Sequence, residues 1–225
     1  MKNKRTALTT VLTLFVGVVL WAGEPWNEKA WSEWGRDDVD RILQDSPWTR
    51  SVTVPGAEQG SFPQRGGAGR VADSVPNRAA GNIVYVRWFS ATSIRQGFVR
   101  GNQLVRTAPE ELATKLLEWP ADYYVIQIDP YNATGDIFLP AVEDPVGQVS
   151  AGAELELSRS KQKLTPVKRE TRGFSDVYYF ARRVDGKPTI PPEETKVKFS
   201  FSVEKSRRSV TFDLSKMMRA GQPDL

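Results

Sequence analysis

The side chains that could do chemistry in this chain are carboxylates, arginines, lysines, tyrosines and serines, because the sequence contains neither cysteine nor histidine. The lack of these two residue types excludes catalytic triads built on histidine and any disulfide framework. Zinc, haem and iron–sulfur centres also lose their usual ligands. We therefore predict no metal site and no cofactor, and the sequence identifies no catalytic residue.

Paired carboxylates are the one common catalytic device that this composition leaves open, and the seven tryptophans would suit a glycan substrate. Because the chain has 27 acidic residues, some pair at a catalytic distance is expected by chance. A carboxylate-dependent glycan-acting enzyme is therefore the first alternative function, and the sequence leans towards a protein that is not an enzyme. The candidate acids are Asp122, Asp129, Asp136, Glu143 and Asp144.

Arg87 is the most unusual charged residue, since it lies inside the otherwise apolar segment IVYVRWF. A buried guanidinium needs a partner, and one interpretation is a salt bridge to Asp122 or Asp129 on a neighbouring strand. The other interpretation is an anion-binding site that Arg87 shares with Arg95 and Arg100 of the following helix. Such a site would make the protein a binder of anionic lipid or polysaccharide through an arginine-rich face, which is the second alternative function.

Tryptophans are concentrated near the amino-terminal end of the chain, where Trp31, Trp34 and Trp48 lie within a short stretch. On a helical wheel Trp31 and Trp34 share one half of the circumference with aliphatic residues, which favours a helix docked onto the main body. The alternative is an aromatic interaction surface that contacts a sugar, a membrane interface or a partner protein.

Residues 1–23 resemble a secretory signal peptide, with basic residues first, an apolar stretch over 7–22 and small residues before Glu24. The apolar stretch is shorter than the roughly 20 residues of a membrane-spanning helix. We predict export to the periplasm or the extracellular space, with cleavage near Glu24. The alternative is an uncleaved signal that anchors the protein in the inner membrane, which would be its only membrane contact.

The net charge of +4 comes mainly from this amino-terminal segment. Three of the 31 basic residues and none of the 27 acidic residues lie in 1–23, so the rest of the chain carries 28 basic against 27 acidic groups. A near-neutral chain of this kind has no electrostatic footprint for nucleic acid. The partner that we expect is an envelope protein or, alternatively, an anionic polymer.

Four regions follow from composition and hydrophobic periodicity. Residues 24–49 predict an amino-terminal helix, strongest over 27–46, and the glycine- and proline-rich residues 50–81 predict a flexible linker. Residues 82–225 would then form the folded core. Within it, 82–130 predict a β-α-α-β unit and 137–215 a mainly antiparallel sheet or small sandwich.

The β-α-α-β unit has clear boundaries. Apolar segments at 83–89 and 123–128 are typical of buried strands. Between them, helical periodicity extends over 94–105 and again from 107 to 119. Strict alternation of apolar and polar residues in the carboxyl-terminal part then indicates strands with one buried and one solvated face. The predicted fold class is α+β.

Three short blocks, WSEWGRDDVDRILQDSPW, IVYVRWFSATSIRQ and VTFDLSKMM, are similar to a group of uncharacterised exported bacterial proteins. In that group a helix of the form W-x(n)-D-V-x-x-I-L-x-x-S-P-W precedes a V-R-W strand. The group has no known activity, cofactor or catalytic residue, so the resemblance implies only an exported protein. The function that we expect is that of a non-enzymatic envelope or periplasmic interaction protein.

Overall fold

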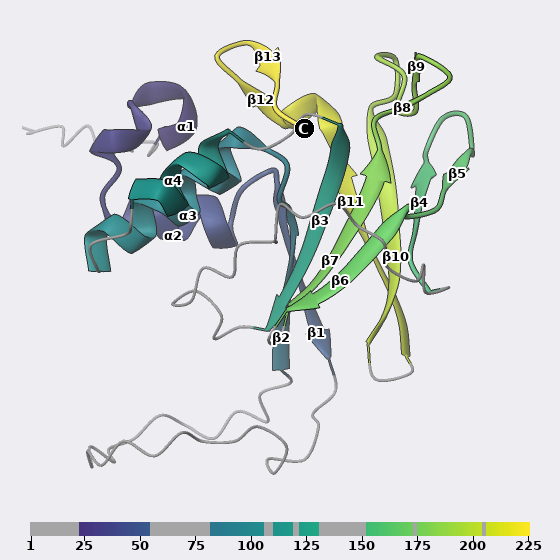
Figure 1. Ribbon diagram of the computed structural model, residues 1–225, viewed down its shortest axis with the longest axis horizontal. Helices are drawn as coiled ribbons and strands as arrows, with labels where there is room; N and C mark the ends of the chain where they lie inside the picture. The colour runs from purple at the N-terminus through teal and green to yellow at the C-terminus, as the bar shows by residue number, and fades with distance from the viewer. Residues whose placement is uncertain are drawn as a thin grey trace, which may run out of the picture.

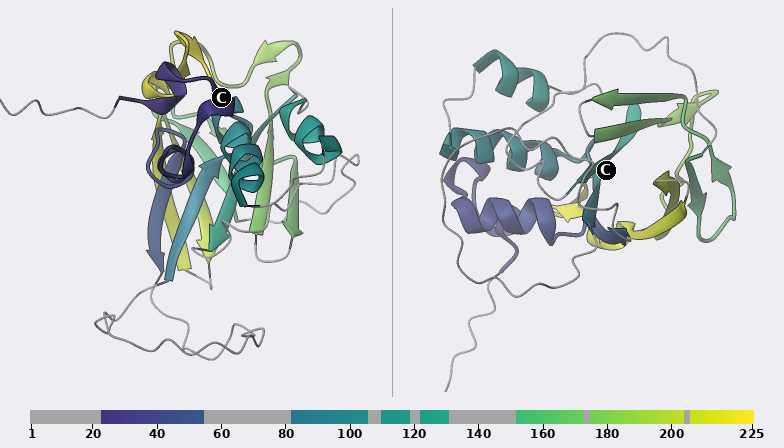
Figure 2. Two further views of the ribbon diagram at one scale, coloured as in Figure 1. Left: turned by 90° about the vertical axis from the view of Figure 1, so that its left-hand side faces the viewer. Right: turned by 90° about the horizontal axis from the view of Figure 1, so that it is seen from below.

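The chain has the α+β fold that the sequence predicts, but its two main sheets are not built from the carboxyl-terminal part alone, since β1 (Thr49–Val54), β2 (Asn82–Trp88) and β3 (Tyr123–Pro130) belong to one of them. Three layers follow one another: helices, a five-stranded sheet and a four-stranded sheet (Figure 1, Figure 2). The computed structural model describes residues 23–54, 82–105, 110–118, 122–130, 152–172, 175–203 and 206–225.

The amino-terminal segment forms three short helices where the sequence predicts one helix over 27–46 or, with Asp37 as its cap, a shorter helix over 38–46. They are α1 (Pro25–Glu28), the 3-10 helix η1 (Trp31–Glu33) and α2 (Arg36–Gln44). Gly35 is extended and precedes α2, and its N–H donates to the Asp38 carboxylate at 3.0 Å. This local cap begins a new helix at Arg36, because the side chain of Asp38 satisfies an amide that no preceding turn serves.

The five-stranded sheet is antiparallel throughout, in the order β1-β2-β3-β7-β6. Its strands are β1 (Thr49–Val54), β2 (Asn82–Trp88), β3 (Tyr123–Pro130), β7 (Ser175–Ala181) and β6 (Lys168–Arg172). Residues 50–54, expected to belong to the linker, are therefore part of an edge strand. The rest of the expected linker, 55–81, lies outside the described residues.

Two helices, α3 (Thr92–Val105) and α4 (Glu110–Leu117), connect β2 to β3. The start of α3 lies at the end of α4, since Arg95 donates to the Leu116 carbonyl at 2.9 Å. The chain thus runs out along one helix and back along the other, and it re-enters the sheet at the end that it left. This return makes β2 and β3 antiparallel neighbours.

Helices α2 and α3 pack closely because α3 carries glycine at the contact. A Cβ atom added to Gly97 would lie 3.0 Å from Leu43 Cδ2 and 3.1 Å from Ile42 Cγ2. One added to Gly101 would lie 3.2 Å from Val39 Cγ1. The two glycines that weaken α3 as an isolated helix therefore make room for the apolar face of α2.

The four-stranded sheet has the order β11-β10-β4-β5 and is also antiparallel. Its strands are β11 (Ser206–Asp213), β10 (Lys196–Val203), β4 (Glu154–Leu157) and β5 (Lys163–Leu164). The remaining elements are β8 (Arg183–Val184), β9 (Lys187–Pro188), η3 (Leu214–Lys216), β12 (Met218–Arg219) and β13 (Gln222–Pro223).

Aromatic side chains fill the space between the two sheets. Trp88 and Phe212 meet edge to face at a centroid distance of 5.3 Å, and Tyr178 and Phe199 do so at 5.6 Å. Arg50 of β1 closes one side of the sandwich, because its Nε donates to the Thr211 carbonyl of β11 at 2.9 Å. The expected carboxyl-terminal sheet is thus divided, with β6 and β7 joining β2 and β3.

The expected signal peptide falls almost entirely outside the described residues, which begin at Gly23. Among the helices that the structure does describe, none has the length and apolar character needed to cross a bilayer.

Candidate functional site

Arg87 and Asp129 form a buried ion pair on the face of the five-stranded sheet that the helices cover. The Arg87 Nη1 atom lies 2.5 Å from Asp129 Oδ2, and each residue is only 1% exposed. Asp129 belongs to β3, the strand next to β2, and its register partner is Tyr85. Of the two partners that the sequence predicts for Arg87, the structure selects Asp129, while Asp122 is exposed.

The second oxygen of Asp129 is held by its neighbours on the same face. Oδ1 accepts hydrogen bonds from Gln127 Nε2 at 2.8 Å and from the Ser175 hydroxyl. The carboxylate therefore accepts hydrogen bonds from three donors, and a buried charge is stable only when it is hydrogen-bonded in this way. A carboxylate held in this way is not available as a nucleophile or a general base.

Arg87 also ties the sheet to the helical layer. Its Nε donates to the Leu43 carbonyl at 2.7 Å, in the last turn of α2. A positive charge at this place is favourable, because the carbonyl end of a helix carries partial negative charge. The guanidinium lies over the rings of Tyr85 and Phe98, at 4.8 and 5.5 Å from their centroids.

Burial lowers the pKa of the Arg87 guanidinium, whereas the charge of Asp129 acts to raise it. Two polar atoms of this cluster, Arg87 Nη2 and Gln127 Oε1, are buried without a hydrogen-bond partner among the described residues. One is a donor and the other an acceptor, and a single bound water would suit either. The cluster is thus a structural network in which one donor and one acceptor remain unused among the described residues.

Arg95 takes a different helix end as its partner. Its Nη1 donates to the carbonyls of Leu116 and Leu117, the last residues of α4, at 2.9 and 3.2 Å. Burial lowers the pKa of Arg95 to about 10, and the nearby charge of Asp224 opposes that shift. Arg95 therefore joins α3 to α4.

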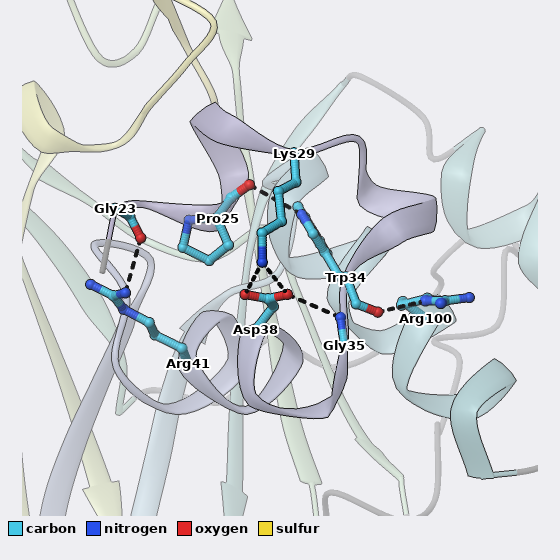
Figure 3. Close-up of polar contacts among 8 residues, drawn as sticks. All are labelled: Gly23, Pro25, Lys29, Trp34, Gly35, Asp38, Arg41 and Arg100. Atoms are coloured by element: carbon cyan, nitrogen blue, oxygen red, sulfur yellow. Dashed lines mark hydrogen bonds and ion pairs between the residues drawn. The ribbon is translucent and has the colours of Figure 1, made fainter. Parts of the chain in front are cut away.

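Arg100 joins α3 to the amino-terminal helices, as Figure 3 shows. Its Nε donates to the Trp34 carbonyl at 2.8 Å, at the end of η1. The indole of Trp34 donates in turn to the Pro25 carbonyl at 3.1 Å, and Lys29 pairs with Asp38 at 3.0 Å. These contacts hold the segment before α2 on the surface of α2 and α3.

The three arginines expected to share an anion site therefore have three separate partners. Arg87, Arg95 and Arg100 each donate to main-chain carbonyls at the end of a different helix. Their geometry gives each of them a structural role, and it does not bring them together around one ligand. The salt bridge was the correct interpretation for Arg87.

The tryptophans of the expected interaction surface lie mostly in the core. Trp34 and Trp48 have no exposed surface, and Trp31 is half-buried and packs against the core cluster. Trp48 meets Trp26 edge to face at 5.2 Å. Trp34 and Trp48 are thus packed in the core, as expected of a helix docked onto the main body, and of these three tryptophans only Trp31 keeps some contact with solvent.

Of the candidate catalytic acids, Asp122 and Asp129 lie in the part of the chain that is described. The other three, Asp136, Glu143 and Asp144, lie outside it. The described residues contain no group of three or more acidic side chains that could hold a metal ion.

Two functional contacts of the polar network had no signal in the sequence. Asp224 accepts hydrogen bonds from the first amides of α3, and Arg182 donates from Nε to the Tyr123 carbonyl at 3.1 Å. Arg182 also lies over the Tyr124 ring at 4.5 Å. Both contacts join segments far apart in the chain, which no local pattern reports.

Comparisons with models of protein families, with curated proteins and with solved structures find no match to this chain. Its function therefore has to be argued from its own residues.

Proposed function

We propose that the protein is exported and acts as a non-enzymatic interaction protein of the bacterial envelope, with the outer face of the four-stranded sheet as its binding surface. The observation that supports this proposal best is the exposure of that face. Its central strand β10 alternates buried Val197 and Phe199 with exposed Lys196 and Lys198. In Figure 1 this sheet lies on the side of the molecule away from the helices.

The chemistry of this face favours a protein partner over an anionic polymer. Basic and acidic side chains alternate across the strands, and Glu154 pairs with Arg207 at 2.6 Å and with Lys163 at 3.3 Å. Lys198 lies opposite Glu156 in the register of β10 and β4. A polyanion is best bound by a surface of one sign, whereas mixed charges and hydroxyl groups match another folded surface.

The charged residues of the interior support a non-enzymatic role. Arg87 and Asp129 are both paired, and Arg95 and Arg100 donate to helix carbonyls. General acid–base catalysis needs a group that can reach a substrate and change its protonation state. These four side chains instead stabilise the packing of the helices on the sheet.

Site-specific photocrosslinking in cells tests the binding surface. A photoreactive amino acid at Lys198 should give one discrete protein adduct, and the same amino acid at exposed Asp40 of α2 should not. Charge reversal at Lys163 should weaken the adduct if the face is the contact. Equal adducts from both positions, or an adduct that consists of polysaccharide or lipid, would contradict the proposal.

Amino-terminal sequencing tests export separately. The mature protein should begin near Glu24 in the extracytoplasmic fraction, which is the outcome expected of a cleaved signal. Met1 retained on a protein of the cytosolic fraction would contradict export without bearing on the surface of the four-stranded sheet.

A further inference from the structure

The first turn of α3 binds a carboxylate that comes from the other end of the chain. Asp224 Oδ1 accepts a hydrogen bond from the Thr92 amide at 2.6 Å, and Oδ2 accepts one from the Ser93 amide at 2.9 Å. The amides at the start of a helix have no partner within it, and they favour negative charge. Asp224 thus satisfies two of them at once.

The main chain around Asp224 is held as firmly as its side chain. The Trp48 indole donates to the Asp224 carbonyl at 2.6 Å, and the Asp224 amide donates to the Met217 carbonyl at 2.9 Å. Arg182 Nη2 donates to the main-chain oxygen of Leu225. The contacts of Trp48 and Arg182 come from other parts of the fold, and the contact with Met217 lies within the segment, so the position of this segment does not depend on the helix amides alone.

Positive charge surrounds the bound carboxylate. Asp224 is 8% exposed, and its charge opposes the downward pKa shifts that burial causes in both Arg95 and Arg182. Ser93, at the same turn, has a fully buried hydroxyl without a hydrogen-bond partner among the described residues. The two amides bind the carboxylate, the two arginines supply positive charge near it, and the Ser93 hydroxyl is a buried donor that no described residue uses.

We propose that the first turn of α3 is a carboxylate-binding site and that Asp224 is its built-in ligand. Residues 217–225 then act as a carboxyl-terminal latch, which fastens the start of α3 to the rest of the fold. Displacement of the latch opens a site that accepts a carboxylate from solution or from another polypeptide. This inference does not depend on the proposed function.

Chemical rescue of Asp224→Ala tests the site. The substitution removes the carboxylate but leaves the carbonyl that accepts from Trp48. For an assumed dissociation constant of about 10 mM, acetate at 50 mM would raise the folding equilibrium constant of the variant about sixfold. We expect its Tm to rise by about 2 °C or more in acetate, relative to chloride at the same ionic strength.

The wild type and Asp40→Ala are the controls, since both keep Asp224 in the site. Neither should show an acetate-specific rise in Tm. A rise of equal size in all three proteins would place the effect elsewhere and overturn the proposal, as would no rise in Asp224→Ala.

Hydrogen exchange provides a second measurement, for the case in which Asp224→Ala does not fold. In the wild type the amides of Thr92 and Ser93 should be protected from exchange, and Asp224→Asn should expose one of them more than the other. An asparagine can accept through only one of its two side-chain groups, so loss of a single bond is expected. Unprotected amides in the wild type would show that the latch is not closed in solution and would refute the proposal.

Discussion

Replacing Arg87 by methionine tests whether the buried pair holds the helices on the sheet. Arg87→Met leaves Asp129, which is 1% exposed, without its cationic partner, and only Gln127 and Ser175 still donate to it. Removing one partner of a buried ion pair costs about 3–5 kcal/mol of the free energy of unfolding. Since a domain of this kind is stable by about 5–15 kcal/mol, we expect a large decrease in the denaturation midpoint.

A double-mutant cycle measures the interaction energy of Arg87 with Asp129 separately from the effects of each residue on its other neighbours. Asp129→Asn keeps an acceptor for Gln127 and Ser175 but leaves the Arg87 charge without its partner, so it should also be costly. The combined variant Arg87→Met/Asp129→Asn should lose at least about 2 kcal/mol less than the sum of the two single changes. Urea denaturation followed by fluorescence measures all three free energies, because Trp88 and Trp48 are buried.

Two results would refute this reasoning. Single changes that add within about 0.5 kcal/mol would mean that Arg87 and Asp129 do not interact energetically. A Tm that rises with phosphate in the wild type but not in Arg87→Met would mean that Arg87 binds an anion. Arg36→Met, at an exposed position on α2, is the matched control and should change stability by less than about 0.5 kcal/mol.

Three further predictions concern other joints of the fold. Gly97→Leu should destabilise the protein by about 1–3 kcal/mol in urea denaturation, because its Cβ alone would lie 3.0 Å from Leu43, whereas a helix-favouring effect alone would stabilise it. Arg50→Met should lower the Tm by removing the hydrogen bond to the Thr211 carbonyl, and an unchanged Tm would show that this contact between β1 and β11 does not stabilise the fold. Burial acts to raise the pKa of Asp38, but the Gly35 amide and Lys29 lower it overall, so its stabilising effect is present above about pH 4 and lost as the pH falls further. The Tm difference between wild type and Asp38→Asn should therefore shrink in melts below pH 4, and a constant difference would contradict the cap.

The Arg87 pair was predictable because its signal is local. A charge within an apolar strand implies burial, and burial implies a partner. Asp122 and Asp129 flank the next predicted strand, 123–128, and the structure selects Asp129. No such signal existed for Arg95 and Arg100, which the sequence placed only in the alternative anion site with Arg87. Their partners are main-chain carbonyls at helix ends, and any sequence supplies these, so composition cannot distinguish such a contact from an anion site.

The strands of the second half show a different limit. Alternation of apolar and polar residues located β4 and β10, because one face of each of these strands is buried. The same pattern was expected of β7, but Val177 and Tyr179 on one face and Tyr178 and Phe180 on the other are all buried. The pattern of apolar residues could not show that β7 pairs with β3 and not with β10, because such a pattern identifies a strand but not its neighbours in the sheet. Strand β1 was missed because its sequence TRSVTV is short and has only two apolar residues, and it runs directly into the glycine- and proline-rich stretch to which most of it was assigned.

The carboxyl-terminal latch lies beyond local reasoning altogether. Asp224 reads as a polar residue in a tail, yet it caps a helix that begins 132 positions earlier at Thr92. The helix start itself was placed within two residues, at 94 against the observed Thr92. The sequence thus shows that a helix begins there, and only the folded chain shows what satisfies its first amides.

Ionic strength should distinguish the structural charges of this protein from those of its proposed binding surface. Arg87 and Arg95 are buried, so salt screens their contacts poorly. Lys163 and Arg207 are exposed, and salt screens their interactions over a Debye length of about 10 Å at 0.1 M. Raising the salt concentration from low to about 0.5 M should therefore leave the Tm nearly unchanged and weaken partner binding. If the Tm falls together with binding, exposed pairs stabilise the fold more than the buried network does. If neither changes, the partner does not recognise the charges of the four-stranded sheet, and the binding surface must be sought elsewhere.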